Sequence, residues 1–154
     1  MSFFLKKLKI QTFKLIGNLD YEHRNPNILK TTPDDTIMRK DPDKITIQYN
    51  KSVTFSFGNI SIYQIIDDDV NYLLRQTYPG RSRHTSIIND TTVNIKILSS
   101  TFNNPRASYF VTIDDGFVSS KQYNEAIMGV SKRVWFLNTC KFILVIKRIF
   151  SLFL

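Results

Sequence analysis

The amino-acid sequence predicts an all-β protein whose short antiparallel strands pack as a sandwich or a barrel. Between about residues 32 and 139, apolar and polar residues alternate with a period of two. The alternating segments are rich in β-branched and aromatic residues, and Asn, Asp, Gly or Pro residues separate them. Such alternation buries one face of each strand and wets the other, which is typical of antiparallel sheets. Several short strands in one domain favour a sandwich or a barrel.

Six segments carry this alternation: KITIQYN (44–50), SVTFSFG (52–58), NISIYQII (59–66), TVNIKIL (92–98), SYFVTID (108–114) and RVWFLNT (133–139). SVTFSFG is expected to place Val53, Phe55 and Phe57 on one side of its strand. The segment DDDVNYLLRQ (67–76) fits either a short helix or a strand. No glycine-rich phosphate loop follows any of these segments, which argues against a nucleotide-binding fold. The predicted core positions are Ile45, Ile47, Tyr49, Ile60, Ile62, Val93, Ile95, Tyr109, Val111, Ile113, Trp135 and Leu137.

Four sequence motifs in this order resemble the bacterial-type Ig-like domain of S-layer (SbsA-like) and other cell-surface proteins, and also fungal surface proteins that carry it. The resemblance covers residues 32–139, about seven-tenths of the chain. Its motifs are a proline-led entry before YNKSV (49–53), the strand GNISI (58–62), YFVTIDDGF (109–117) and the closing WFLNT (135–139). The family implies an Ig-like antiparallel β-sandwich of about seven strands, in which Trp135 matches a core tryptophan.

The sequence divides into a basic, apolar N-terminal extension (1–31), the sandwich domain (32–139) and a short hydrophobic, basic tail (140–154). In the extension, apolar residues could share one helix face, as in a membrane-surface segment; the alternative is a leader without function. Lys147 and Arg148 interrupt the apolar run of the tail, which is too short for a spanning helix of about 20 residues. The helix face of the extension consists of Phe4, Leu5, Leu8, Leu15 and Ile16.

The net charge of +8 is concentrated at the two ends of the chain. Residues 1–24 hold five basic and two acidic side chains, residues 25–131 hold eleven of each, and residues 132–154 hold five basic and no acidic ones. A protein that follows nucleic-acid phosphates needs Lys and Arg clustered on its folded domain. We therefore expect no nucleic-acid partner.

Asp114 and Asp115 are adjacent carboxylates at the end of an alternating segment, just before Gly116. Neighbouring strand residues point to opposite faces, so the two cannot face each other across a bound sugar as glycosidase carboxylates do. The sequence favours a strand-end turn, with metal ligation as the alternative. A calcium site would require these two residues and Glu125 to converge at one end of the sandwich with three further acidic residues, Asp67, Asp68 and Asp69.

Other candidate sites are single residues or short motifs. Cys140 is the only cysteine, which excludes an intrachain disulfide and a cysteine-based zinc site, and His23 and His84 are expected at the surface. Trp135 is either an exposed sugar-stacking platform or, as its strand position favours, a core residue, and Tyr109 is expected to be a core aromatic that hydrogen-bonds across a corner. Three N-glycosylation sequons begin at Asn50, Asn59 and Asn89.

The sequence contains no nucleophile elbow, so we expect no enzyme activity, no cofactor and no small-molecule substrate. The first hypothesis is a structural or adhesion module of a cell-surface or secreted protein, whose partners are neighbouring Ig-like domains, surface proteins or glycans. The second is a peripheral membrane protein attached through its basic, apolar termini. The third is a carbohydrate-binding domain.

Overall fold

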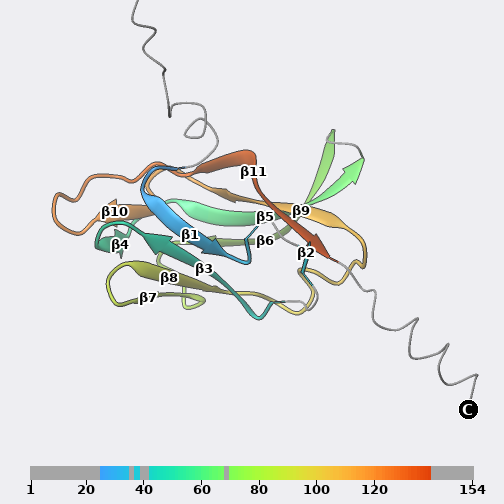
Figure 1. The fold of residues 1–154 in the computed structure, drawn as a ribbon, viewed down its shortest axis with the longest axis horizontal. Coiled ribbons are helices and arrows are strands. Elements are labelled where there is room, and N and C mark those ends of the chain that lie inside the picture. Colours follow the sequence, from blue (N-terminus) through green and yellow to red (C-terminus); the bar gives the residue numbers. More distant parts are fainter. Residues whose placement is uncertain (1–24, 35–36, 39–41, 68–69, 140–154) are drawn as a thin grey trace, which may run out of the picture.

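The computed structural model describes residues 25–34, 37–38, 42–67 and 70–139, and these residues form strands and no helix (Figure 1). The predicted extension up to residue 24 and the predicted tail 140–154 lie outside the described residues. The strands in chain order are β1 (Ile28–Thr32), β2 (Ile37–Met38), β3 (Lys44–Tyr49), β4 (Val53–Phe55), β5 (Asn59–Asp67), β6 (Asn71–Pro79), β7 (Thr85–Ile88), β8 (Thr92–Lys96), β9 (Ser108–Ile113), β10 (Val118–Ser120) and β11 (Val130–Thr139).

The strands form two main sheets and one small ribbon. The four-stranded sheet has the order β1-β3-β8-β7, the five-stranded sheet has the order β2-β11-β9-β5-β6, and β10 pairs with β4. Neighbouring strands are antiparallel except β2, which runs parallel to β11. The chain crosses from the edge of one sheet to the edge of the other between β1 and β2, through a cis Thr32–Pro33 peptide bond. The all-β prediction with antiparallel sheets is confirmed.

Both sheets contribute to one hydrophobic core, so the fold has a sandwich-like arrangement. The core cluster includes residues of β3 and β8 from one sheet and of β5, β9 and β11 from the other. Each of the twelve predicted core residues is at most 5% exposed. Burial of such side chains stabilises the folded state by about 1.5–3 kcal/mol each relative to leaving them exposed.

Of the two alternatives left open for residues 67–76, the strand is found for residues 71–76, because β6 pairs along β5 from Asn71↔Asp67 to Pro79↔Asn59. The structure differs from the sequence expectation at three places. The strands β1, β2, β7 and β10 were not predicted, since they are short or, in β1, interrupted by polar residues. The prediction that Phe57 lies on the same side of a strand as Val53 and Phe55 is wrong, because β4 ends at Phe55 and Phe57 is 83% exposed. The sheet also starts before residue 32, as β1 begins at Ile28.

Side chains of β6 tie the five-stranded sheet to the loop that follows β8. The buried Gln76 amide donates to the Lys96 carbonyl at 2.9 Å and accepts from the backbone amide of Leu98 at 3.0 Å. The Arg75 guanidinium donates to the carbonyls of Ser100 and Thr101 in the same loop. The Gln76 contacts satisfy a buried polar side chain, and leaving such a group unpaired typically costs about 1–3 kcal/mol.

Tyr49, at the end of β3, makes the fold sensitive to alkaline pH. The side chain is 2% exposed, and burial raises its pKa above the ordinary value. Above pH about 10 the tyrosine of the unfolded chain ionises while that of the folded chain stays protonated, so stability falls as pH rises. We expect Tyr49→Phe to lessen this alkaline loss, as measured by urea melts at pH 8 and pH 11. An equal loss in both proteins would contradict the assignment.

Candidate functional site

The paired aspartates after β9 hold a turn in place. Asp114 Oδ2 accepts hydrogen bonds from the backbone N and the Nδ2 of Asn59, both at 3.0 Å. Asp115 Oδ1 accepts from the backbone N of Gly129 at 2.7 Å. Gly116 follows with φ = 72°, a conformation that glycine adopts without a steric penalty. Both carboxylates therefore connect the strand-end turn to the neighbouring chain segments.

Asp67, the first residue of the acidic run, lies far from this turn. Asn59, the partner of Asp114, begins β5, and Asp67 ends the same nine-residue strand. At about 3.3 Å per residue the two ends of β5 are roughly 26 Å apart. Asp67 therefore does not converge with Asp114 and Asp115, as a calcium site would require, because β5 separates them. Among the described residues, no three His, Cys, Asp or Glu side chains are placed to hold a metal ion, and Asp68 and Asp69 lie outside those residues.

The three sequon asparagines are exposed, but they differ in their contacts. The Nδ2 of Asn50 donates to the carbonyl of Pro26 at 3.2 Å, and that of Asn59 donates to Asp114. Asn89 stands in the turn between β7 and β8 with φ = 53°. Glycan attachment at Asn89 would break none of these hydrogen bonds, so of the three sites it is the one at which a glycan would disturb the observed contacts least.

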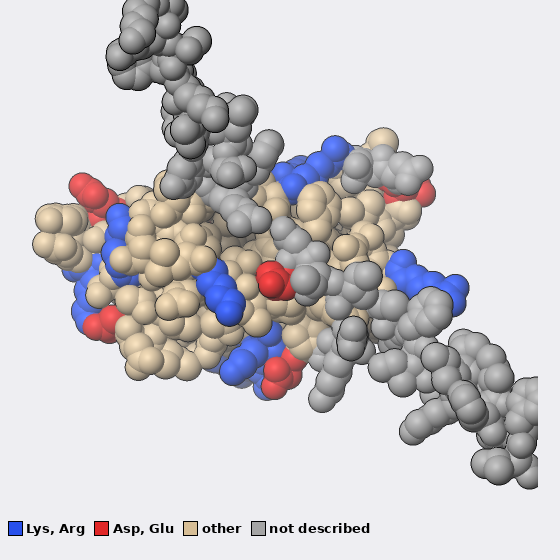
Figure 2. Space-filling view, in the orientation of Figure 1, with Lys and Arg blue, Asp and Glu red and all other residues tan. Residues whose placement is uncertain are grey.

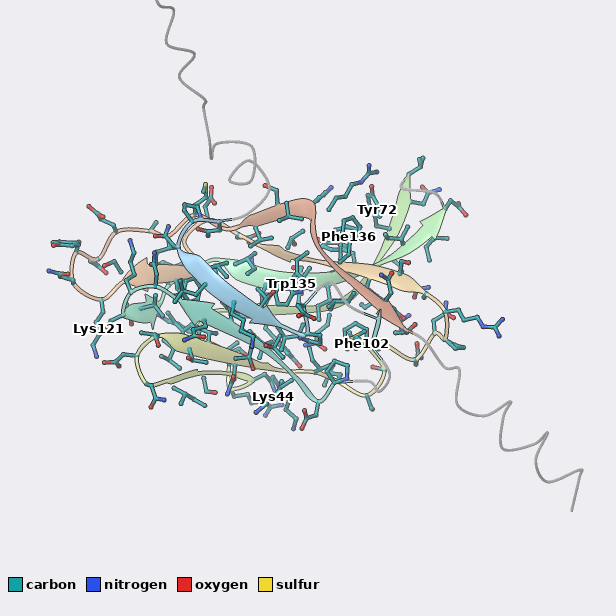
Figure 3. The ribbon with its side chains drawn as sticks, in the orientation of Figure 1. Lys44, Tyr72, Phe102, Lys121, Trp135 and Phe136 are labelled. Atoms are coloured by element: carbon teal, nitrogen blue, oxygen red, sulfur yellow. The ribbon has the colours of Figure 1, made fainter. Side chains whose placement is uncertain are left out.

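Trp135 lies between the sheets and offers no surface for stacking (Figure 3). It is 3% exposed, and its indole N–H donates to the carbonyl of Pro33 at 2.9 Å. Beside it, between β1 and β11, is a cavity of about 230 Å³. This volume is below the roughly 300–1,000 Å³ of most small-molecule sites. The cavity is lined by Asn25, Ile28, Leu29, Lys30, Thr31, Asp34, Val130, Val134 and Trp135.

A cluster of partly accessible aromatic rings lies on the outer face of the five-stranded sheet. The strand register aligns Phe136 of β11, Phe110 of β9, Tyr63 of β5 and Leu74 of β6 in one row. Phe110 is not part of the core cluster between the sheets, although its neighbours Tyr109 and Val111 are. Because side chains alternate along β9, Phe110 points away from the core, and the other residues of the row point to the same side of the sheet.

Other rings cover Phe110, and these covering rings remain accessible. Tyr63 stacks on Phe110 with ring centroids 5.1 Å apart, and Tyr72 meets it edge-on at 4.9 Å. Phe110 is consequently 0% exposed, whereas Tyr63, Tyr72 and Phe136 are half-buried and Leu74 is 48% exposed. Tyr72 and Phe136 lie together on one side of the molecule in Figure 3. We call the set of Tyr63, Tyr72, Leu74 and Phe136 the aromatic face.

A bulge in β11 brings two basic side chains to the aromatic face. The pairing of β11 with β9 shifts register between Val130 and Trp135, and Arg133 within this bulge has φ = 65°. The Arg133 Nη2 donates to the Tyr72 hydroxyl at 2.8 Å, and the Lys132 Nζ lies 5.7 Å from the centre of the Tyr72 ring. Bulges re-aim side chains, and a non-glycine residue at positive φ is uncommon and tends to occur at functional sites.

The two cations of the bulge carry the excess charge of the folded body. Residues 25–131 are electrically neutral, and the charge count groups Lys132 and Arg133 with the basic C-terminal residues, although both lie within the predicted domain 32–139. The structure places both in β11. The ion pair between Lys121 and Asp90, with its atoms 3.0 Å apart, involves neither. On the face seen in Figure 2, basic and acidic residues are interspersed and form no continuous basic stripe.

The left-handed conformation of Arg133 predicts an unusual order of stability in two variants. Arg133→Gly and Arg133→Ala both remove the guanidinium and its bond to Tyr72. Only alanine retains a Cβ that is strained at positive φ, so we expect the glycine variant to be more stable by about 0.5–1 kcal/mol. Chemical denaturation of both proteins measures the difference. A more stable alanine variant would show that the bulge does not hold this conformation.

Sequence reasoning missed the aromatic face because it assumed that each strand has one wet side. Phe110, Phe136 and Tyr63 occupy the positions that alternation assigns to solvent. The available signal was the presence of adjacent aromatic residues, Tyr109-Phe110 and Trp135-Phe136, which cannot share one face of a strand. Two large rings in a row indicate apolar surface on both sides of the sheet.

No protein-family model, curated protein or solved structure matches the chain. In the part of the chain that the structure describes, there is also no helix long and apolar enough to cross a membrane.

Proposed function

We propose that this protein is a non-catalytic Ig-like module of a cell-surface or secreted protein, which binds a protein or a glycan through the aromatic face. The observation that carries the proposal is the cluster of half-buried rings on the outer face of the five-stranded sheet, with Lys132 and Arg133 beside it. A sandwich-like body needs its inner faces for the core, so apolar rings on an outer face add nothing to that core. Exposed apolar and aromatic surface is typical of interaction sites.

The strand order supports the Ig-like assignment. In an Ig sandwich, strands A, B, E and D form one sheet and G, F and C form the other, with C′ added next to C in variable-type domains. The observed orders β1-β3-β8-β7 and β11-β9-β5-β6 follow the same sequence of neighbours. In this correspondence the short strand β2 extends the second sheet beside the G position.

Tyr109 gives a second, independent reason for the assignment. It lies near the start of β9, the F position, and is fully buried. Its hydroxyl donates to the carbonyl of Asn104 at 3.4 Å, five residues upstream. A tyrosine at this place, hydrogen-bonded to backbone a few residues before it, is the tyrosine corner of many Ig domains.

The use of the carboxylates supports a non-catalytic role. Asp114 and Asp115 accept hydrogen bonds from the amides that fix the turn after β9, and Asp67 accepts one from Asn71 Nδ2 at 3.1 Å in the β5–β6 hairpin. These contacts give each of the three carboxylates a structural role. The module would then act by presenting a preformed binding surface, since the two packed sheets hold the outer face rigid for a partner.

The proposal is tested with a fluorescent, multimerised form of the protein applied to glycan arrays and to surface-protein arrays. The face variant Tyr63→Ala/Phe136→Ala is compared with a matched control, Leu29→Ala/Ile88→Ala, which removes exposed apolar side chains from the other sheet. Leu29 and Ile88 are 63% and 44% exposed. Melting curves show that each variant is folded.

We expect the wild type and the control to bind the same ligand, and the face variant to lose at least tenfold in affinity. Equal binding by all three proteins would show that the aromatic face is not the binding site. Absence of binding on both kinds of array would leave a spacer without a binding face and would contradict the adhesion role.

A further inference from the structure

We propose that the aromatic face binds an anionic saccharide, one that carries carboxylate or sulfate groups. This inference rests on the proposed function, because it names the ligand class of the same face. It uses two features together: accessible rings that can pack against a sugar ring, and two adjacent cations that the β11 bulge directs at those rings.

The rings supply an apolar surface. The row from Phe136 to Leu74 crosses four neighbouring strands, and at about 4.8 Å between strands it spans roughly 14 Å. Tyr63 lies nearly parallel to the buried Phe110, with an angle of 16° between the two rings. The C–H face of a pyranose packs well on such rings, and a tyrosine hydroxyl at the edge can still hydrogen-bond to sugar hydroxyls.

The two cations give the aromatic face a preference for ligands that carry negative charge. Lys132 and Arg133 are exposed, and both approach Tyr72, whose ring also meets Phe110 edge-on. A guanidinium binds a carboxylate or a sulfate through paired N–H donors, and a nearby ammonium adds attraction without strict geometry. Among the described residues, no carboxylate forms an ion pair with Lys132. An anionic group on the ligand is complementary to Lys132, and Arg133, which donates to Tyr72, lies beside it.

The size of the aromatic face favours a saccharide over a protein partner. A stable protein interface buries about 800 Å² on each side and carries a large apolar centre. The aromatic face and its bulge comprise three half-buried rings, one leucine and two cations, and Ile65, which pairs with Tyr72, adds one more half-buried apolar side chain. A short oligosaccharide, with one ring stacked and one acidic group paired, uses such a set completely.

Isothermal titration calorimetry on the full chain tests the inference, with three saccharide probes and one peptide. The probes are an oligomer of about six uronic acids, a sulfated oligosaccharide of similar length and a neutral oligosaccharide with the same linkage as the uronate. An acidic peptide of equal charge is the fourth ligand. We expect the uronate or the sulfated oligosaccharide to bind at least tenfold more tightly than the neutral one and than the peptide, and to weaken with added salt.

Variants locate the site. Lys132→Gln/Arg133→Gln is expected to weaken binding of the anionic oligosaccharide at least tenfold, and Tyr63→Ala to do the same. The matched control Lys44→Gln/Lys51→Gln removes two exposed lysines away from the aromatic face and should change affinity less than twofold. Lys44 lies on the opposite side of the molecule from Tyr72 and Phe136 (Figure 3).

Three outcomes would overturn the inference: equal binding of the neutral oligosaccharide, tighter binding of the acidic peptide, or equal losses in the control and the bulge variant. Failure of both anionic oligosaccharides to bind would overturn it as well. If the multimerised protein still binds an array through the aromatic face in that case, the proposed function stands and only the ligand class is wrong. If the Tyr63→Ala/Phe136→Ala variant binds the arrays normally, the proposed function itself fails.

Discussion

Trp135→Ala is expected to lower the free energy of unfolding by about 3–5 kcal/mol, the usual cost of deleting a large buried aromatic side chain. The indole is 3% exposed and belongs to the core cluster that both sheets share. Its removal leaves a void next to the existing cavity between β1 and β11. It also leaves the Pro33 carbonyl without the N–H donor that lies 2.9 Å away.

Trp135→Phe separates these two contributions. Phenylalanine retains most of the ring volume but cannot donate to Pro33, so we expect a smaller loss of about 1–2 kcal/mol. Urea melts followed by far-ultraviolet circular dichroism measure both variants without relying on tryptophan fluorescence. A loss below 1 kcal/mol for Trp135→Ala would show that the indole does not pack between the sheets.

Gly129→Ala is expected to cost at least about 3 kcal/mol, among the largest effects of a single added methyl group. A Cβ at residue 129 would lie 1.9 Å from the carbonyl oxygen of Ile113, and that oxygen belongs to the backbone of β9. The neighbouring residue Val130 pairs with Ile113, and the amide of Gly129 is bonded to Asp115. The backbone can relieve the overlap only by separating β11 from β9.

Gly116→Ala is the matched control for this prediction. Gly116 has φ = 72°, yet an added Cβ would come no closer than 3.6 Å to another heavy atom. Only conformational strain of about 1–2 kcal/mol is expected there. Chemical denaturation should therefore rank Gly129→Ala well below Gly116→Ala in stability. The reverse order would contradict the close approach of the two chain segments.

The alternation of apolar residues was sufficient to predict the all-β class and the core. Residues such as Ile45, Ile47 and Val111 are buried because their strands have a strict period of two and a continuous sheet on either side. Strand β1 was missed for the opposite reason. Its polar residues Lys30 and Thr32 are exposed at a sheet edge, and the strand is held by pairing with β3 rather than by an apolar pattern.

The binding face could not be derived from local pattern, because it depends on register. Phe136, Phe110 and Tyr63 come together only when β11, β9 and β5 are aligned, and no short segment encodes that alignment. The contact of Arg133 with Tyr72 further requires a bulge between Val130 and Trp135. Lys132 and Arg133 are next to each other in the sequence, but only the fold brings them to a cluster of rings.

The aspartates show the converse case, in which a local pattern indicated the correct structure. Asp114, Asp115 and Gly116 follow an alternating segment, and the order of residues favoured a turn over a site. The carboxylates bond to the amides of Asn59 and Gly129, which are 55 and 14 residues away in the sequence, so the local pattern indicated the turn but not the segments that it joins. The sequence alone could not show that Asp67 lies far from Asp114, because that separation depends on the length of β5 in the folded sheet.

The central claim is that the protein binds through the outer face of its five-stranded sheet, and chemical-shift mapping tests it most directly. In a ¹⁵N-labelled sample titrated with the ligand found on the arrays, we predict that the perturbed amides cluster around Tyr63, Tyr72, Phe136 and the bulge at Lys132 and Arg133. Perturbations confined to the turn at Asp114 and Asp115, or to the cavity beside β1, with the aromatic face unchanged, would contradict the claim.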